Sequence, residues 1–153
     1  MKTADFPSGD VLALGVTGIS DVQGAFAQTT RPLSHYYEAV SAGRFATERG
    51  VRLTDDDQRR RALITQLMCN FWVDLRGHSG VAPNRLHEEP CDQDYFATEL
   101  AQLDGFRADG LLRLGDGQLE VTPLGRLFVR NIAMVFDAYL KHPQARPTFS
   151  RTV

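Results

Sequence analysis

Apolar residues recur every three or four positions over residues 55–74, the stretch DDDQRRRALITQLMCNFWVD, which is the spacing of one helix face. The members of this stripe are Leu63, Ile64, Leu67, Met68, Phe71 and Trp72. Thr54 and Asp57 form a capping-box-like start, and three consecutive acids lie where the helix dipole is positive. The pattern predicts a helix over residues 55–74.

The second half of the chain continues with a helix, a hairpin and a last helix. The stretch DQDYFATELAQL predicts a helix over residues 92–103, with an apolar face made by Tyr95, Phe96, Leu100 and Leu103. Apolar residues alternate on both sides of the turn sequence Gly-Asp-Gly, which predicts a β-hairpin with Leu112, Leu114, Leu119 and Val121 on one face. Thr122 followed by Pro123 marks the start of a last helix, which is predicted to end near residue 140.

The N-terminal third gives weaker signals. The apolar run VLALGV predicts a buried strand over residues 11–16, and a strand that is apolar on both faces usually belongs to a larger sheet. No partner strand is predicted before the hairpin, so we expect this strand to be disordered, to pack on the helical domain or to pair with a second copy. A short helix is predicted over residues 34–42, with Ser34 as N-cap and Gly43 as its stop, and residues 43–53 are predicted to be a linker.

This order of elements predicts a mainly α fold. We expect a winged-helix-like helical domain with one β-hairpin, preceded by an extended N-terminal arm. The arm covers residues 1–50, the winged-helix-like domain residues 51–141, and an extended tail residues 142–153. Residues 76–91 are rich in glycine and proline and are predicted to be a loop.

Composition and charge narrow the classes of function. Net charge is −2, and the helix that would read DNA in a winged helix carries acids and no lysine or arginine, so nucleic-acid binding is disfavoured. No apolar run reaches the roughly 18 residues of a membrane helix, and the N-terminus lacks the apolar core of a signal peptide. Two cysteines without a CxxC pattern indicate a reducing, cytoplasmic setting.

Arginine makes up nearly all of the basic residues, because Lys2 and Lys141 are the only lysines. Biased genome composition is the simpler explanation, and a demand for bidentate recognition of carboxylate or phosphate is the alternative. His87 and Cys91 are spaced four apart and could hold zinc, but a solvated loop explains them as well, so no metal site is predicted.

The last predicted helix carries polar residues within an apolar pattern. Arg126 and Arg130 are spaced four residues apart and are expected to share a face, and Asn131 and Asp137 also need an explanation. In a purely structural reading, Arg130 pairs with a nearby acid and Asp137 caps or bridges. In a functional reading, Arg126 and Arg130 face a partner or an anionic ligand.

Six stretches, in chain order, carry a resemblance to a known family. They are LGVTGIS, LITQLMCNF, DYFATEL, ADGLL, TPLGRLFVRNIAMVFDAYL and FSRTV. They resemble the C-terminal part of the oxygen-independent coproporphyrinogen III oxidases, the anaerobic enzymes of haem synthesis, over about residues 11–153. The last stretch resembles that family's own C-terminus. The resemblance implies that residues 11–16 are the last strand of a barrel.

The resemblance implies a radical S-adenosylmethionine enzyme. In that family a partial β/α barrel holds a [4Fe–4S] cluster on a CxxxCxxC motif and two S-adenosylmethionine molecules. The enzyme converts two propionates of coproporphyrinogen III to vinyl groups, which gives protoporphyrinogen IX. Ile19 matches a position that lines the second S-adenosylmethionine site. This sequence has no CxxxCxxC motif and lacks the barrel apart from its apparent last strand, so no cofactor and no catalysis are expected of this chain alone. Residues 26–29 are FAQT where the family usually has YAQN, so this turn departs from the family.

Three functional hypotheses follow. In the first, the chain is the catalytically silent C-terminal portion of such an oxidase, from a natural short reading frame or an expression fragment. Arg126, Arg130 and Asn131 then contact the radical S-adenosylmethionine barrel or the carboxylates of the porphyrinogen substrate. In the second, a stand-alone module binds porphyrin or haem, or docks onto a full-length oxidase, with axial-ligand candidates His35, His78, His87 and His142. The third, a DNA-binding winged helix, is disfavoured by charge.

Overall fold

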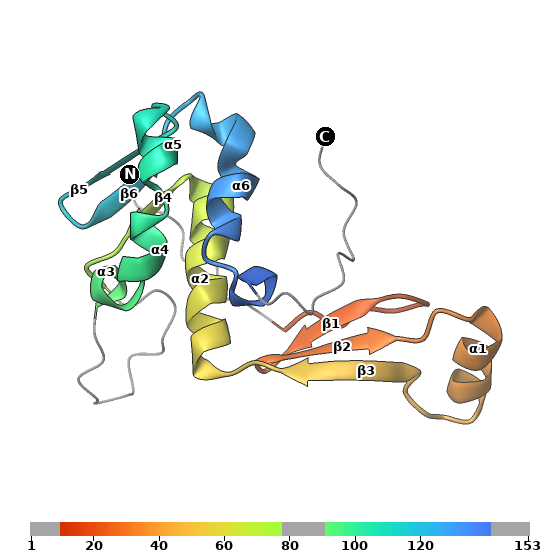
Figure 1. Ribbon diagram of the computed structural model, residues 1–153. Helices are drawn as coiled ribbons and strands as arrows, with labels where there is room; N and C mark the ends of the chain where they lie inside the picture. The colour runs from red at the N-terminus through yellow and green to blue at the C-terminus, as the bar shows by residue number, and fades with distance from the viewer. Residues whose placement is uncertain (1–9, 78–90, 142–153) are drawn as a thin grey trace. The chain divides into compact units, whose positions relative to one another are not determined.

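The chain forms two compact units in its computed structural model, which describes residues 10–77 and 91–141 (Figure 1). The N-terminal unit is Met1–Asp55 and the C-terminal unit is Asp56–Val153. Each unit contains a three-stranded antiparallel sheet. The protein is therefore a mixed α/β structure, and the prediction of a mainly α fold with a single hairpin was wrong on this point.

The N-terminal unit is a small sheet with one helix. Its strands are β1 (Ile19–Val22), β2 (Ala25–Thr29) and β3 (Thr47–Arg52), and they lie side by side in that order. Helix α1 (Leu33–Ser41) connects β2 to β3 (Figure 1). The predicted linker over residues 43–53 was thus wrong, because most of it is the edge strand β3.

A two-residue turn joins β1 to β2. Gln23 and Gly24 both have positive φ angles, of 47° and 75°, which is the backbone of a type I′ turn. That turn matches the right-handed twist of the paired strands. Glutamine is not among the residues that favour the first position, so the hairpin gave no strong sequence signal.

The strand predicted over residues 11–16 was also wrong. Only Val11 pairs, and it does so with Asp21 through two backbone hydrogen bonds of 2.7 and 2.8 Å. The backbone then turns away, because Gly15 and Thr17 have φ angles of 95° and 59°, which no extended strand can hold.

Helix α1 matches its prediction closely, apart from the cap. It begins at Leu33 after Pro32, with no side-chain cap, so Ser34 lies inside the helix and is not its N-cap. Gly43 ends it as predicted, with a φ angle of 68°.

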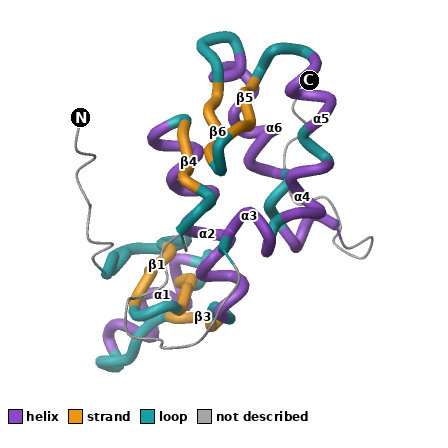
Figure 2. Tube along the Cα trace, turned by 90° about the vertical axis from the view of Figure 1, so that its left-hand side faces the viewer, coloured by secondary structure: helices purple, strands orange, loops and turns teal. Residues whose placement is uncertain are grey.

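The C-terminal unit interleaves short helices with its sheet. Its strands lie in the order β4-β6-β5, and Figure 2 shows them beside one another. The elements are α2 (Asp55–Asn70), β4 (Trp72–Asp74), α3 (Asp92–Tyr95), α4 (Ala97–Ala101), α5 (Asp104–Ala108), β5 (Leu112–Gly115), β6 (Gln118–Val121), the 3₁₀ helix η1 (Gly125–Phe128), α6 (Val129–Met134) and the 3₁₀ helix η2 (Ala138–Lys141).

Helix α2 ends four residues earlier than predicted. Phe71 has a φ angle of 60°, which stops the helix, and the chain continues as β4. In β4, Val73 pairs with Leu119 of β6 and is fully buried. The aromatic and β-branched residues Trp72 and Val73 suit a strand, and the pairing with β6 overrides the helical spacing.

The two later helices form in the predicted regions, but each is interrupted and divided into shorter helices. The helix predicted over residues 92–103 is divided among α3, α4 and the residues leading to α5, and the last helix is divided into η1, α6 and η2. Thr122 caps this last segment as predicted. The Gly125 amide donates to Thr122 Oγ1 at 3.1 Å, and the hydroxyl donates to the Gly110 carbonyl at 2.8 Å.

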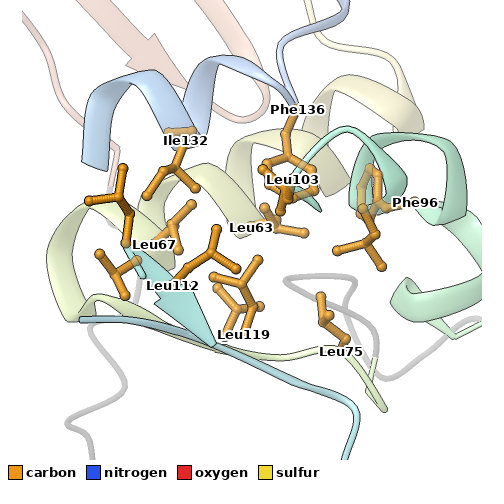
Figure 3. Close-up of a cluster of buried hydrophobic side chains, with 14 residues drawn as sticks. Leu63, Leu67, Leu75, Phe96, Leu103, Leu112, Leu119, Ile132 and Phe136 are labelled. Atoms are coloured by element: carbon orange, nitrogen blue, oxygen red, sulfur yellow. The ribbon is translucent and has the colours of Figure 1, made fainter. Parts of the chain in front are cut away.

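One buried apolar cluster holds the C-terminal unit together. It gathers side chains from α2, the three strands, α3 to α5 and α6, and Figure 3 shows Ile132 and Phe136 pointing into it toward Leu63, Leu67 and Leu103. Each fully buried leucine contributes roughly 1.5–3 kcal/mol. The predicted apolar face of residues 92–103 is confirmed by this cluster. That of residues 55–74 is confirmed in part, because Met68 is exposed and Trp72 lies in β4.

Charged residues also tie α2 to the rest of this unit. The Arg59 guanidinium lies 2.6 Å from a carboxylate oxygen of Asp92, and both side chains are almost fully buried. Arg60 donates to Asp56, to Glu99 and to the Phe136 carbonyl. Burial acts to lower the pKa of Arg60, but its bonds to Asp56 and Glu99 raise it above the usual value, so the side chain stays cationic.

A surface ion pair predicts a pH effect at the end of β4. Arg76 donates to Asp74 through its side chain, at 2.9 and 2.7 Å, and through its backbone amide, and these bonds lower the pKa of Asp74 from 3.8 to about 2. The depressed pKa means that the pair contributes stability above pH 3.8 and loses it as pH falls through about 2. Because Arg76 is exposed and Asp74 is partly exposed, water screens the pair and its contribution is small.

Nuclear magnetic resonance of the Asp74 carboxyl carbon checks this expectation. A titration midpoint near 2 is expected in the wild type, and the Arg76→Ala variant should move it up toward 3.8. An unshifted midpoint in the wild type would contradict the pairing.

Candidate functional site

An apolar groove lies over one face of the N-terminal sheet. We call it the sheet groove; it has a volume of about 470 Å³ and is lined by Ile19, Phe26, Gln28, Arg49, Gly50 and Val51. The strand register places the side chains on one face, because Ile19 pairs with Gln28, Gln28 with Arg49, and Phe26 with Val51. The groove is therefore built by residues from three different strands.

The sheet groove combines an apolar floor with a polar end. Ile19 and Val51 are both more than half exposed, and Phe26 lies between them in the register. At the polar end, Arg49 Nε donates to Gln28 Oε1 at 2.7 Å. Such a surface suits a ligand that has a flat or aliphatic part and a polar or anionic end.

Sequence reasoning found Ile19 and missed its neighbours. Phe26 and Gln28 were noted only as a departure from the family pattern, and Arg49 and Val51 were assigned to a linker. Arg49 and Val51 alternate with Gly50 in β3, and this alternation could have predicted that both side chains lie on one face of a strand.

The N-terminal unit exposes much apolar surface. Among its described residues, the buried apolar side chains are Ala39 and Ala46. The exposed large ones are Val11, Leu12, Leu14, Ile19, Leu33, Tyr37, Val40, Phe45 and Val51. A sheet and helix with so little buried apolar area gain little stability by themselves.

The candidate residues of the last helices lie on the surface of the C-terminal unit. Arg126, Arg130 and Asn131 are all exposed. The guanidinium of Arg126 lies over the Phe71 ring, 4.7 Å from its centroid, which is a cation–π contact. Arg126 therefore has a structural partner at the end of α2.

Arg130 and Asn131 belong to a stripe on the outer side of η1 and α6. We call it the outer stripe; it consists of Leu127, Arg130, Asn131 and Met134, spaced at i, i+3, i+4 and i+7. Within residues 10–77 and 91–141 the structure records no ion pair for Arg130, so the expected pairing with a nearby acid is not found there.

Asp137 has a structural role. Its carboxylate accepts a hydrogen bond of 2.9 Å from the Tyr139 amide at the start of η2. The interpretation of Asp137 as a cap is confirmed.

The structure describes only one of the four candidate axial-ligand histidines. His35 lies exposed on α1, and His78, His87 and His142 lie outside the described residues. Cys91 Sγ lies 3.1 Å from an Asp94 carboxylate oxygen. In the described part of the chain, no three His, Cys, Asp or Glu side chains gather to hold a metal ion.

The helices of the described part are also too short or too polar for a bilayer. None of them meets the length and hydropathy that a membrane-spanning helix requires.

Comparison with curated proteins gives clear relatives. The chain is 44% identical to the oxygen-independent coproporphyrinogen III oxidase of Synechocystis over 149 residues, which cover 96% of this chain and 31% of the relative. It is 43% identical to the Thermostichus vulcanus protein of the same name, with 43% of that relative covered. The Escherichia coli protein of that name is 38% identical over 94% of this chain. No protein-family model matches the sequence.

Comparison with solved structures agrees. A structure of coproporphyrinogen III oxidase (HemN) from Escherichia coli, described as a radical SAM enzyme, superposes with a TM-score of 0.75 at 37% identity. The match covers 87% of this chain and 29% of that structure. The chain spans about a third of the length of most relatives it matches, and it corresponds to their C-terminal part.

Proposed function

We propose, from the premise that this chain is homologous to the C-terminal part of the oxygen-independent coproporphyrinogen III oxidases, that it serves as that part of such an enzyme. The observation that carries the proposal is the match of sequence and fold over nearly the whole described chain. The relatives are named as oxidases of coproporphyrinogen III. We propose the same substrate for a longer protein that contains this chain. In our proposal, the chain supplies a cofactor surface and a covering domain, not the reacting centre.

The sheet groove is our candidate for contact with S-adenosylmethionine. Family resemblance points to Ile19, and the structure places Ile19 on an open apolar surface next to Phe26 and Val51, with polar groups at one end. These residues fit an adenosyl or methionyl group packing against the floor. In a radical enzyme, S-adenosylmethionine supplies the radical when it is reductively cleaved, and this chain's residues would only bind and orient it.

The iron–sulfur cluster does not fit the described residues. Cys69 and Cys91 are single thiols, and no metal-ligating group of three or more side chains forms in residues 10–77 and 91–141. A cluster bound through cysteine thiolates needs several converging sulfurs. We assign the cluster to the part of the relatives that this chain does not cover.

We also propose that the C-terminal unit is a variant of the winged-helix fold. Helix α2 is followed by short helices, the β5–β6 hairpin and the last helices, and β4 adds a third strand to that hairpin. In our proposal this unit covers substrate or contacts the barrel, and it has no nucleic-acid role because its acids outnumber cations on α3 to α5. A cytoplasmic location and a homodimer through the N-terminal unit remain predictions.

A chimera tests the proposed function. The matching C-terminal part of the Synechocystis oxidase is replaced by this chain, and anaerobic conversion of coproporphyrinogen III is measured. We expect turnover within about tenfold of the parent, because the two sequences are 44% identical over 96% of this chain. The parent truncated before the matching part is the control and should be inactive. A folded, cofactor-loaded chimera without turnover would refute the proposal.

Substitution of Ile19 tests the cofactor assignment in the same chimera. Ile19→Asp places a carboxylate on the apolar floor of the sheet groove, and its desolvation disfavours a packed ligand. We expect about one equivalent less S-adenosylmethionine in equilibrium dialysis, with unchanged folding because Ile19 is exposed. Thr47→Asp, on the exposed strand β3 but outside the groove, is the control. Equal binding by both variants would remove Ile19 from the site.

A further inference from the structure

Segment η1–α6 is apolar on two opposite sides. Its inner side contributes Ile132, Ala133 and Phe136 to the buried cluster of the C-terminal unit. Its outer stripe is again partly apolar, and Leu127 and Met134 are 79% and 45% exposed. A helix that is apolar on both sides is usually buried on both sides, whereas in the described part of the chain the outer stripe stays exposed.

Neighbouring side chains widen the outer stripe. Leu124 and Phe128 are also exposed, and both lie within one turn of Leu127. Arg130 and Asn131 are exposed and lie between Leu127 and Met134 in the stripe. Large apolar side chains around an arginine are the composition of the centre of a protein–protein interface.

The outer stripe is also held rigidly. The Thr122 hydroxyl caps the start of the segment, and Gly125 is packed directly against the Leu111 backbone. At the other end, Arg60 Nη1 donates to the Phe136 carbonyl at 3.0 Å. A surface that is fixed before binding loses little conformational entropy on association.

The shape of the outer stripe separates two possible occupants. A helix side with anchors at i, i+3, i+4 and i+7 fits into a groove of another protein surface. A flat tetrapyrrole needs a concave site that buries most of its area, and the side of a single helix does not provide one. Arg126, the second cation of this region, is already stacked on Phe71.

We infer that the outer stripe docks onto the portion of the longer oxidases that this chain does not cover, with Arg130 facing an acidic group there. The inference rests on the proposed function. The uncovered portion makes up more than half of each relative, since the chain covers 31% and 43% of the first two. That portion is large enough to supply a groove for the outer stripe, and in the relatives it belongs to the same polypeptide.

Two substitutions, compared in two settings, test the inference. Leu127→Gln and Arg130→Glu are placed in the isolated chain and in the Synechocystis chimera. The isolated chain is expected to keep its unfolding midpoint, because both side chains are exposed there. In the chimera, kcat/KM is expected to fall at least tenfold and proteolysis of the C-terminal unit to speed up. Met68→Gln and Arg107→Glu change an exposed methionine and arginine outside the stripe, and neither effect is expected for them.

Photo-crosslinking provides a readout that does not depend on turnover. A p-benzoylphenylalanine residue is placed at position 127 of the chimera, with position 68 as control. We expect crosslinks from position 127 to peptides of the Synechocystis portion of the same molecule. Crosslinks only between two molecules, or none, would overturn the inference.

The outcomes separate the inference from the proposed function. An active chimera whose stripe variants behave like the controls overturns the docking inference and leaves the function standing. A folded, inactive chimera with intramolecular crosslinks from position 127 refutes the function and supports the docking.

If the chimera is insoluble, measurements on the isolated chain decide between the possible occupants of the outer stripe. The oligomeric state is expected to be the same with and without the substitutions, whereas an oligomer that Leu127→Gln dissociates assigns the stripe to a second copy. Saturable coproporphyrin III binding that Arg130→Glu abolishes assigns it to a ligand, and either result overturns the inference.

Discussion

Gly125→Ala is expected to destabilise the C-terminal unit by about 3 kcal/mol or more, the upper end of overpacking effects. A Cβ atom on Gly125 would meet the carbonyl oxygen and carbon of Leu111 and would lie 3.0 Å from Val121 Cγ1. The oxygen and carbon are backbone atoms, which cannot swing aside as a long side chain can. Segment η1–α6 would therefore have to move away from the turn before β5, and Ile132 and Phe136 would lose part of their packing.

Denaturant unfolding of the isolated chain measures this effect. Gly105→Ala is the matched control, because Gly105 lies in α5 and a Cβ there would meet nothing within 4 Å. Alanine favours a helix interior over glycine by roughly 0.8–1 kcal/mol, so the control variant should be neutral or slightly more stable. If both variants have the same midpoint as wild type, the close approach of Gly125 to Leu111 is not present in solution.

Removing one partner of the buried Arg59–Asp92 pair is expected to cost about 3–5 kcal/mol, because the remaining charge stays buried after losing its ion-pair partner. The two side chains are 2% and 0% exposed, and Arg59 also lies over the Tyr95 ring at 4.1 Å. Asp92→Ala and Arg59→Ala should therefore lower the midpoint of chemical unfolding strongly.

Two comparisons make the test specific. Arg76→Ala removes an ion pair of similar length on the surface, where water screens the charges, and it should lower the unfolding midpoint far less. The double variant Arg59→Met with Asp92→Leu replaces both charges by apolar groups, and it should cost less than either single alanine variant. A double variant that costs the sum of the two singles would contradict the account of an uncompensated buried charge.

The two hairpins show where local sequence suffices. Asp116 and Gly117 join β5 to β6 with φ angles of 53° and 69°, and Asp-Gly is a strong signal for that turn, so the hairpin was predicted. Gln23 and Gly24 adopt the same backbone conformation between β1 and β2, but glutamine gives no such signal. The same type of turn was therefore predicted from the sequence between β5 and β6 but not between β1 and β2.

The residues of the candidate site were also only partly predictable from the sequence. Ile19 and the residues Arg126, Arg130 and Asn131 were reached from sequence by resemblance and by their unusual polarity within an apolar helix. The floor of the sheet groove was not, because Val51 and Arg49 join Ile19 only through the pairing of β2 with β3. Arg126 and Arg130 were expected to act together, and the contact of Arg126 with Phe71 separates them.

The local residue pattern was enough to predict most of the apolar face of α2, the apolar face of residues 92–103, the β5–β6 hairpin and the Thr122 cap. Each depends on neighbours within a few residues, whose spacing follows from helix and strand geometry. The sheet of the N-terminal unit, the end of α2 at Phe71 and the exposure of the outer stripe could be seen only in the folded chain. Strand pairing and burial depend on residues distant in sequence, and their contributions outweigh the local preferences that a sequence pattern records.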